Sequence, residues 1–324
     1  MEHIGIYGGS FDPPHLGHLQ VALQAIRERS LDKLLIIPSY AAPKELSLAD
    51  AATLEQRLDM LRLCFSQIPN VEIISPDEHL ESTCPDDQRI EEIAPVLTRA
   101  DIRRLLAFRC GDDFLPEGVS RYIQMNNLYG TGKSLRHLPM DKLEQAVISL
   151  LKPNRVAHVL GCRDTAVELA RIWGVDETDA ARAGLLHDIT KALDGPLQLT
   201  LCRAYGIILD NFSKQNPKTL HALTGSLVAR RIFGENDAVV SAIASHTTGK
   251  ADMNMLEKVI YVADYMEPNR NFDGVDELRK LAYSDIDQAL KLGLEMTLTM
   301  LWRQGREISP ESQQALMWLQ RKEE

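Results

Sequence analysis

Apolar residues change their spacing near residue 140, and this change constrains the fold more than any other feature of the chain. Before it, short apolar runs at residues 3–7, 34–37 and 71–74 alternate with stretches of helical spacing at 16–26 and 53–66. After it, apolar residues recur only at helical spacing. Alternating strands and helices indicate a parallel sheet. We therefore predict an N-terminal α/β domain with a parallel sheet and a C-terminal all-α domain.

The length agrees with two domains, because 324 residues exceed what one hydrophobic core ordinarily organises. We place the first domain at residues 1–130, a linker at 131–140 and the second domain at 141–324. The linker is rich in glycine and basic residues. Its Gly132-Lys133-Ser134 sequence imitates a phosphate-binding loop, but Asn127 stands where that motif needs glycine. A linker is therefore the better interpretation.

The net charge and the composition of the chain argue against several classes of binding partner. The formal net charge of −10 argues against a groove for duplex nucleic acid, which would be strongly basic. No apolar run reaches the roughly 18 residues that a membrane span needs, and the first residues do not resemble a signal peptide. The five cysteines are scattered without a C-x-x-C pair, which favours a reducing compartment. We expect a cytoplasmic protein that binds neither nucleic acid nor membrane; the sequence leaves its oligomeric state open.

The first predicted strand ends in a glycine-rich loop that runs from Gly8 to His18. Glycines let backbone amides approach phosphate oxygens at the positive N-terminus of the helix that follows. His15 and His18 are three residues apart, which predicts that they share one helix face. Together they can stabilise charge on a triphosphate as a nucleotidyl group is transferred. An isolated H-x-x-H pair is usually structural, but the length of this motif favours nucleotide binding.

This loop resembles the H-x-G-H nucleotidyltransferases, and among them the nicotinate mononucleotide adenylyltransferases, in almost every residue of the motif. The resemblance implies a Rossmann-like domain that takes ATP as substrate or ligand, with nicotinate mononucleotide as a second substrate. It implies catalytic roles for His15 and His18. It also implies a nucleotide site made of glycine, hydroxyl, aromatic and basic residues, namely Gly8, Gly9, Ser10, Phe11, His15, His18, Lys44 and Arg103.

The chain departs from that family in two places. Only residues 75–96 separate the third strand from the segment at 98–103 that resembles the family's phosphate motif, whereas a further strand-helix-strand unit needs about 30 residues. That segment also lacks two hydroxyl residues of the motif. We therefore predict a truncated Rossmann-like domain that binds nucleotide. An active adenylyltransferase and a non-catalytic nucleotide sensor both stay open, and the short insert favours the sensor.

The second half contains a series of residues that can bind metal ions: His158, His187, Asp188, His221, His246 and Asp264. They fall on or beside predicted helices that include 178–189, 195–205, 218–233, 236–246, 252–266 and 284–303. One such histidine alone would most often satisfy a buried hydrogen bond, but the series points to a metal centre. Imidazole and carboxylate ligands suit iron, manganese, cobalt or zinc, and a carboxylate beside a histidine can bridge two ions.

The segments around these residues are similar to those of the HD-domain metal phosphohydrolases, and in detail to the bacterial symmetrical diadenosine tetraphosphate hydrolases of that type. The similarity covers residues 141–322 and is carried by the segments at 183–191, 220–225, 245–249 and 261–270. It implies metal-dependent hydrolysis of diadenosine tetraphosphate and related dinucleoside polyphosphates. Cleavage at the centre of the symmetrical substrate yields two ADP.

The same resemblance implies roles for individual residues. Two divalent ions are expected, with iron favoured over manganese, cobalt and zinc. One ion is held by His158, His187, Asp188 and Asp264, and the other by Asp188, His221 and His246. Catalysis is expected to involve the bridging Asp188 together with two cationic side chains near the phosphates, Lys191 and Arg270. Thr247 and Arg155 are weaker candidates.

Overall fold

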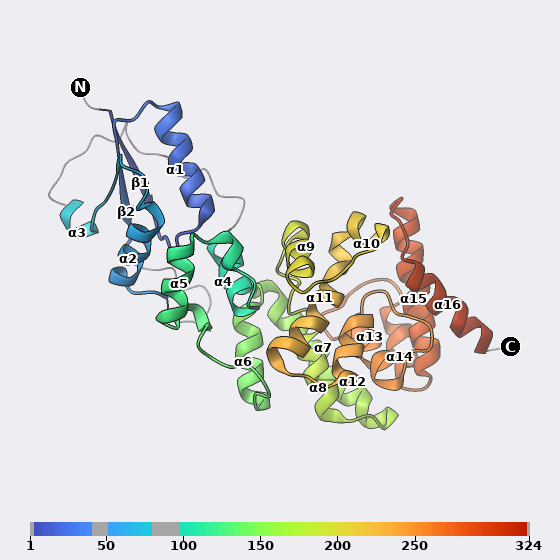
Figure 1. Cartoon of the computed structure of the whole chain (residues 1–324). Coiled ribbons are helices and arrows are strands. Elements are labelled where there is room, and N and C mark those ends of the chain that lie inside the picture. Colours follow the sequence, from blue (N-terminus) through green and yellow to red (C-terminus); the bar gives the residue numbers. More distant parts are fainter. Residues whose placement is uncertain (1–2, 41–50, 80–97, 323–324) are drawn as a thin grey trace. The chain divides into compact units, whose positions relative to one another are not determined.

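The computed structural model describes residues 3–40, 51–79 and 98–322. The chain divides into two compact units, Met1–Ser134 and Leu135–Glu324. Figure 1 traces the chain in colours that follow the sequence, from blue at the N-terminus to red at the C-terminus.

Among the residues that the structure describes, three short strands form the sheet of the first unit: β1 (Ile4–Gly9), β2 (Lys33–Pro38) and β3 (Val71–Ile73). All three are parallel and lie in the order β1-β2-β3. The predicted parallel sheet is therefore confirmed. In parallel sheets ligands bind beyond the carboxyl ends of the strands, and the glycine loop follows β1 at that edge.

The helices of the first unit are α1 (Leu16–Glu28), α2 (Leu54–Phe65), α3 (Pro76–His79), α4 (Arg99–Ala107) and α5 (Glu117–Met125), with 3₁₀ turns at Asp112–Phe114 and Leu128–Gly130. Thr53 and Thr98 begin α2 and α4 with capping boxes, in which the side chain and the backbone exchange hydrogen bonds. Figure 1 shows α1 and α2 beside the strands. The two helices and the strands share one core, whose largest buried members include Tyr7, Phe11, Leu34, Ile36, Met60 and Leu61.

The second unit is helical throughout its described residues, which confirms the all-α prediction. Its helices are α6 (Met140–Leu150), α7 (Pro153–Trp173), α8 (Glu177–Leu186), α9 (Gly195–Ala204), α10 (Asn211–Gln215), α11 (Leu220–Val228), α12 (Asp237–Ser245), α13 (Met255–Met266), α14 (Val275–Ala282), α15 (Ile286–Arg303) and α16 (Pro310–Lys322). A 3₁₀ turn lies at Pro217–Thr219.

Four helices, α7, α8, α12 and α13, pack against one another at the centre of this unit. Their local sequence explains where they begin and end. Asp176, Asn236 and Asn254 cap the first turns of α8, α12 and α13 through their side-chain oxygens. Gly174 ends α7 with φ of 67°, a left-handed conformation that glycine adopts without strain.

Two details differ from the sequence prediction. The single helix predicted at 218–233 is α-helical only to Val228 and continues as a π turn at Ala229–Phe233. Helices α10, α14 and α16 were not predicted. Within the second unit, which begins at Leu135, the His137 amide donates to the Phe233 carbonyl at 2.8 Å.

Among the described residues, no helix combines the length and the apolar character that crossing a membrane would require.

Candidate metal centre

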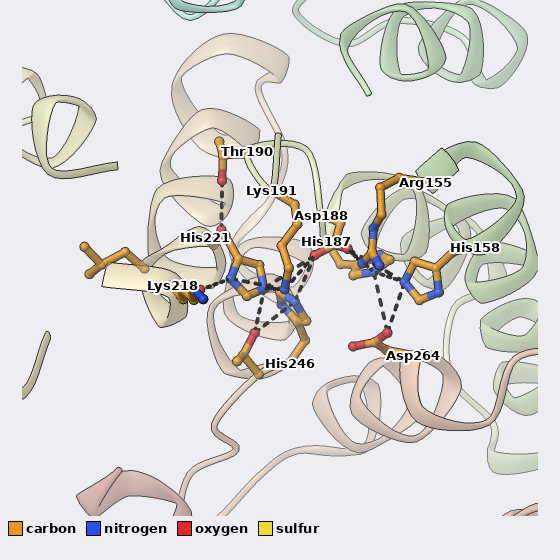
Figure 2. Close-up of polar contacts among 12 residues, drawn as sticks. Arg155, His158, His187, Asp188, Thr190, Lys191, Lys218, His221, His246 and Asp264 are labelled. Atoms are coloured by element: carbon orange, nitrogen blue, oxygen red, sulfur yellow. Dashed lines mark hydrogen bonds and ion pairs between the residues drawn. The ribbon is translucent and has the colours of Figure 1, made fainter. Parts of the chain in front are cut away.

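The six metal-capable residues of the second unit meet in one place (Figure 2). His158 comes from the second turn of α7 and Asp264 from the last turn of α13. His187 and His246 occupy the C-terminal ends of α8 and α12, His221 begins α11, and Asp188 follows His187. The four histidines and Asp188 are buried. Residues separated by more than 100 positions are thus brought within reach of one another.

The hydrogen bonds of the four histidines fix which ring nitrogen carries the proton. Nδ1 of His187 lies 2.8 Å from the Gly184 carbonyl, and Nδ1 of His221 and His246 lie 2.7 Å from the carbonyls of Lys218 and Ile243. A carbonyl can only accept, so each Nδ1 carries the proton and each Nε2 keeps its lone pair. In His158 too, Nδ1 carries the proton and Nε2 the lone pair, because Nδ1 lies 3.1 Å from the carboxylate oxygen Oε1 of Glu267, which accepts.

These lone pairs point at one another and at carboxylate oxygens. Nε2 of His158 lies 3.2 Å from Nε2 of His187 and 3.2 Å from Oδ1 of Asp264. In each of these contacts two hydrogen-bond acceptors face each other, and their lone pairs repel unless a cation lies between them. The arrangement therefore calls for a positive ion among the ligand atoms.

Asp188 stands between two pairs of histidines. Its Oδ2 lies 3.7 Å from Nε2 of both His158 and His187. Its Oδ1 lies 3.4 Å from Nε2 of His221 and 3.7 Å from Nε2 of His246. That oxygen is buried and has no hydrogen-bond partner among the described residues. One carboxylate that faces two ligand groups is the arrangement of a bridge between two ions.

The ligand atoms fit divalent ions in type and in spacing. They form overlapping groups of three with every atom within 4.8 Å of the others: His158, His187 and Asp188; His187, His246 and Asp264; Asp188, His221 and His246. Atoms held about 2.1 Å from one ion lie about 3–3.5 Å apart, as several of these do. Burial holds the pKa of His187 and His221 well below its usual value and lowers that of His246 to about 4. The imidazoles of these three histidines are therefore neutral near pH 7, as metal ligands must be.

Three cationic side chains surround the ligands (Figure 2 labels two of them). Arg155 forms an ion pair with Asp188, and Nη2 of Arg270 lies 2.5 Å from Oδ1 of Asp264. Nζ of Lys191 lies 2.8 Å from Nε2 of His221. Lys191, Arg270 and Arg155 therefore all lie beside the proposed ligands, and their catalytic roles stay predictions.

Sequence reasoning missed Glu267. Its carboxylate is almost wholly buried, and while Oε1 accepts from His158, Oε2 accepts from the Asn269 amide at 2.7 Å and from Asn269 Nδ2 at 2.8 Å. A carboxylate behind a ligating histidine fixes its tautomer and raises its basicity. Its place three residues after Asp264 was the only signal in the sequence.

Replacing Glu267 with glutamine is expected to weaken metal binding about 10- to 100-fold. Asn269 donates twice to Oε2, so the new amide must place its oxygen there and turn its NH₂ toward His158. His158 Nδ1 would then have to accept, which puts the proton on Nε2 and removes a ligand atom. Metal titration of the purified chain measures the loss, with Glu144→Gln on α6 as the control. Equal affinities in both variants would contradict this role.

The glycine loop of the first unit brings His15 and His18 together, but not on one helix face. His15 precedes α1 as its cap, with its Nδ1 accepting from the Gly17 amide, while Nδ1 of His18 accepts from the His15 amide, both at 3.1 Å. Both Nε2 atoms must then carry protons. Burial lowers the pKa of His15 to about 4 and, with the charge of His15, that of His18 to about 2. They are neutral donors, and Nε2 of His15 has no partner among the described residues.

The other predicted nucleotide-binding residues differ in their surroundings. A Cβ on Gly8 would meet no atom within 4 Å, so its backbone is open to a ligand, whereas the Phe11 ring is buried beside His18. Arg103 is buried and forms an ion pair with Asp12. Arg99, one turn earlier on α4, also reaches the loop, where it donates to Ser10 Oγ at 3.0 Å. Gly9 follows Gly8 at the end of β1, and Lys44 lies outside the described residues.

Comparison with known proteins matches each unit to a family. Residues 6–131 match the cytidylyltransferase-like family and residues 155–269 match the HD domain family. The symmetrical bis(5'-nucleosyl)-tetraphosphatase of Bacillus subtilis is 37% identical over 170 residues, which are 52% of this chain and 91% of that protein. A probable nicotinate-nucleotide adenylyltransferase/Ap4A hydrolase of Mycoplasma pneumoniae is 26% identical over 90% of this chain and 97% of its own.

A solved structure supports the match of the second unit. The crystal structure of a predicted HD superfamily hydrolase involved in NAD metabolism, from Clostridium acetobutylicum, is 37% identical with a TM-score of 0.56, and covers 57% of this chain and 98% of its own. The chain therefore belongs to the family of the symmetrical bis(5'-nucleosyl)-tetraphosphatases, hydrolases with an HD domain, and joins that domain to a cytidylyltransferase-like one.

Proposed function

We propose that the second unit hydrolyses symmetrical dinucleoside tetraphosphates, and diadenosine tetraphosphate first among them, to two nucleoside diphosphates. One observation carries the proposal: four histidines aim their Nε2 atoms at Asp188 and Asp264, in a domain whose relative in Bacillus subtilis is named as that enzyme. His158, His187, Asp188 and Asp264 would hold one divalent ion. Asp188, His221 and His246 would hold the other.

The charges of the site suit a polyphosphate. Imidazoles bind metal ions in their neutral form, so two carboxylates and four imidazoles would contribute a charge of −2, and two divalent ions would bring the ligand set to +2. Arg155, Lys191 and Arg270 add positive charge beside it. A tetraphosphate would be drawn to this field and held by it, and negative charge that develops on the leaving phosphate would be stabilised there.

Bound divalent ions would lower the pKa of a water molecule toward 7 and polarise phosphoryl oxygens. The protein orients what surrounds them. Asp188 and Asp264 fix the positions of Arg155 and Arg270. Thr247 Oγ1 lies 2.9 Å from His221 Nε2 and 3.1 Å from His246 Nε2, and with both Nε2 lone pairs directed at an ion its one hydroxyl proton would be free to donate to a phosphate oxygen. We propose iron as the ion, which the resemblance to the family favours, and the mixed imidazole and carboxylate set without sulfur suits it as it does manganese, cobalt or zinc.

Product identification tests the reaction. Purified protein incubated with diadenosine tetraphosphate is expected to release ADP alone, with metal analysis of the same preparation showing two ions per chain. Release of ATP with AMP would contradict central cleavage, and turnover by metal-free protein would contradict the role of the ions.

A second candidate function belongs to the first unit. We infer that its loop binds ATP, because two neutral histidines offer Nε2–H donors there and the Gly8 backbone is open. The Mycoplasma relative, similar over both units, is named a probable nicotinate-nucleotide adenylyltransferase/Ap4A hydrolase. Pyrophosphate release from ATP and nicotinate mononucleotide would identify an active transferase. ATP binding without that release would identify a nucleotide sensor.

His18→Asn is expected to weaken ATP binding about tenfold, as the loss of one hydrogen bond to a charged group predicts. The asparagine oxygen can replace Nδ1 as the acceptor for the His15 amide, so the cap of α1 stays while the Nε2–H donor is lost. Calorimetry on the full chain without metal measures the change. His3→Ala, an exposed histidine outside the loop, is the control. An unchanged affinity in His18→Asn would reject the assignment of the loop.

A further inference from the structure

Two cavities open beside the metal centre, both inside the second unit. The Tyr265 cavity, of about 810 Å³, is lined by Tyr265, Phe272 and Arg303 and reaches His246 and Asp264. The Phe212 cavity, of about 620 Å³, is lined by Phe212, Lys218 and Arg306 and reaches His221. Both volumes lie in the range of small-molecule sites.

The wall between the two cavities lies at the metal centre itself. Lys191, Thr247, Thr297 and Met300 line both of them. Nζ of Lys191 and Oγ1 of Thr247 each lie within 2.9 Å of His221 Nε2. A ligand that extends from one cavity into the other must therefore pass over the residues that surround Asp188.

The two cavities offer the same combination of groups. Each holds an aromatic ring on which a base can stack and cations that suit a phosphate, with Phe272 and Arg303 in one and Phe212, Lys218 and Arg306 in the other. The rings of Tyr265 and Phe272 meet edge to face at 5.3 Å, and Thr297 donates to the Tyr265 hydroxyl at 2.9 Å. The aromatic wall of the Tyr265 cavity is thus held in place before a ligand binds.

We propose that the Tyr265 cavity and the Phe212 cavity are the two nucleoside sites of one substrate. A dinucleoside tetraphosphate would place one nucleoside in each and lay its four phosphates across Lys191 and Thr247, with the central anhydride at Asp188. This rests on the hydrolase function proposed above and deepens it. The substrate would be cleaved at its central anhydride because the metal centre lies between two sites of similar chemistry. A site for one nucleoside alone would leave the second cavity without a role.

Kinetics with two substrates test the proposal on the full, metal-loaded chain. Phe272→Ala and Phe212→Ala should each raise KM for diadenosine tetraphosphate about tenfold, because each removes the ring on which one base stacks. The metal content of both variants should stay unchanged. Adenosine 5'-tetraphosphate has a single nucleoside, so only one of the two variants should raise its KM. Trp302→Ala is the control, because Trp302 is exposed and lines neither cavity. If either phenylalanine variant leaves KM for the dinucleotide unchanged, a nucleoside does not bind in that cavity.

A binding measurement separates this inference from the function on which it rests. In a His18→Asn background, which weakens the nucleotide loop of the first unit, calorimetry with ADP should show two sites per chain, and Phe212→Ala or Phe272→Ala should each weaken one of them. One ADP per chain would overturn the two-site proposal even in a protein that cleaves diadenosine tetraphosphate. Two ADP per chain without any turnover would support the two sites and reject the hydrolase function.

Discussion

Replacing Asp188 with alanine is expected to lower the turnover of diadenosine tetraphosphate by at least about a thousandfold, a larger loss than removal of a group behind a metal ligand causes. Among the described residues, Asp188 is the one whose two oxygens face both ligand groups, His158 with His187 and His221 with His246. Its loss removes a ligand from both ions at once. Metal analysis should show fewer than two ions per chain.

The fold should survive the Asp188→Ala substitution, because the change removes a buried charge and creates none. It does leave Arg155 without its carboxylate partner, but that side chain is partly exposed and can turn to water. Asp164→Ala is the matched control, since Asp164 lies on the outer surface of α7 and pairs with Arg163. If Asp188→Ala turned over substrate like Asp164→Ala, the metal centre would not be the site of hydrolysis.

The sequence predicted the fold where periodicity is strong and less well where short elements depend on their neighbours. The three strands and the long helices follow from regular apolar spacing and from capping residues such as Asn236 and Asn254. Helix α14 spans only Val275–Ala282, and tertiary packing stabilises a helix that short. The π turn at Ala229–Phe233 has the same apolar spacing as an α-helix over so few residues, so the pattern could not reveal it.

The sequence predicted each of the proposed metal-binding residues, but it did not predict the residues that hold them in position. The motifs around His187, His221, His246 and Asp264 predicted that these residues meet, and they do, although their metal ligation stays a prediction. Glu267 escaped notice because an acidic residue at a helix end usually lies on the surface, and only the fold buries it behind His158. His15 was assigned to a helix face because spacing alone does not tell a cap from a first turn.

Removing the metal is expected to lower the unfolding midpoint of the second unit by roughly 8–16 °C. An ion whose free concentration is a thousand times its Kd stabilises the folded state by about 4 kcal/mol. The unfolding midpoint of a unit of the size of Leu135–Glu324 changes by about 2–4 °C for each kcal/mol. The physical cause is that several acceptor atoms lie close together around Asp188 with their lone pairs facing one another. Without a cation, the acceptor atoms of His158, His187 and Asp264 repel one another across about 3–4 Å, and unfolding relieves that repulsion.

Tryptophan fluorescence reads this change in the helical unit alone, because the three tryptophans, Trp173, Trp302 and Trp318, all lie within it. The midpoint should fall when a chelator strips the purified chain and return when a divalent ion is added back. Asp188→Ala should respond little to the chelator, since it holds its ions poorly from the start. A midpoint that stays constant while metal analysis confirms removal would mean that no ion stabilises this cluster, and the ligand assignment would fail with it.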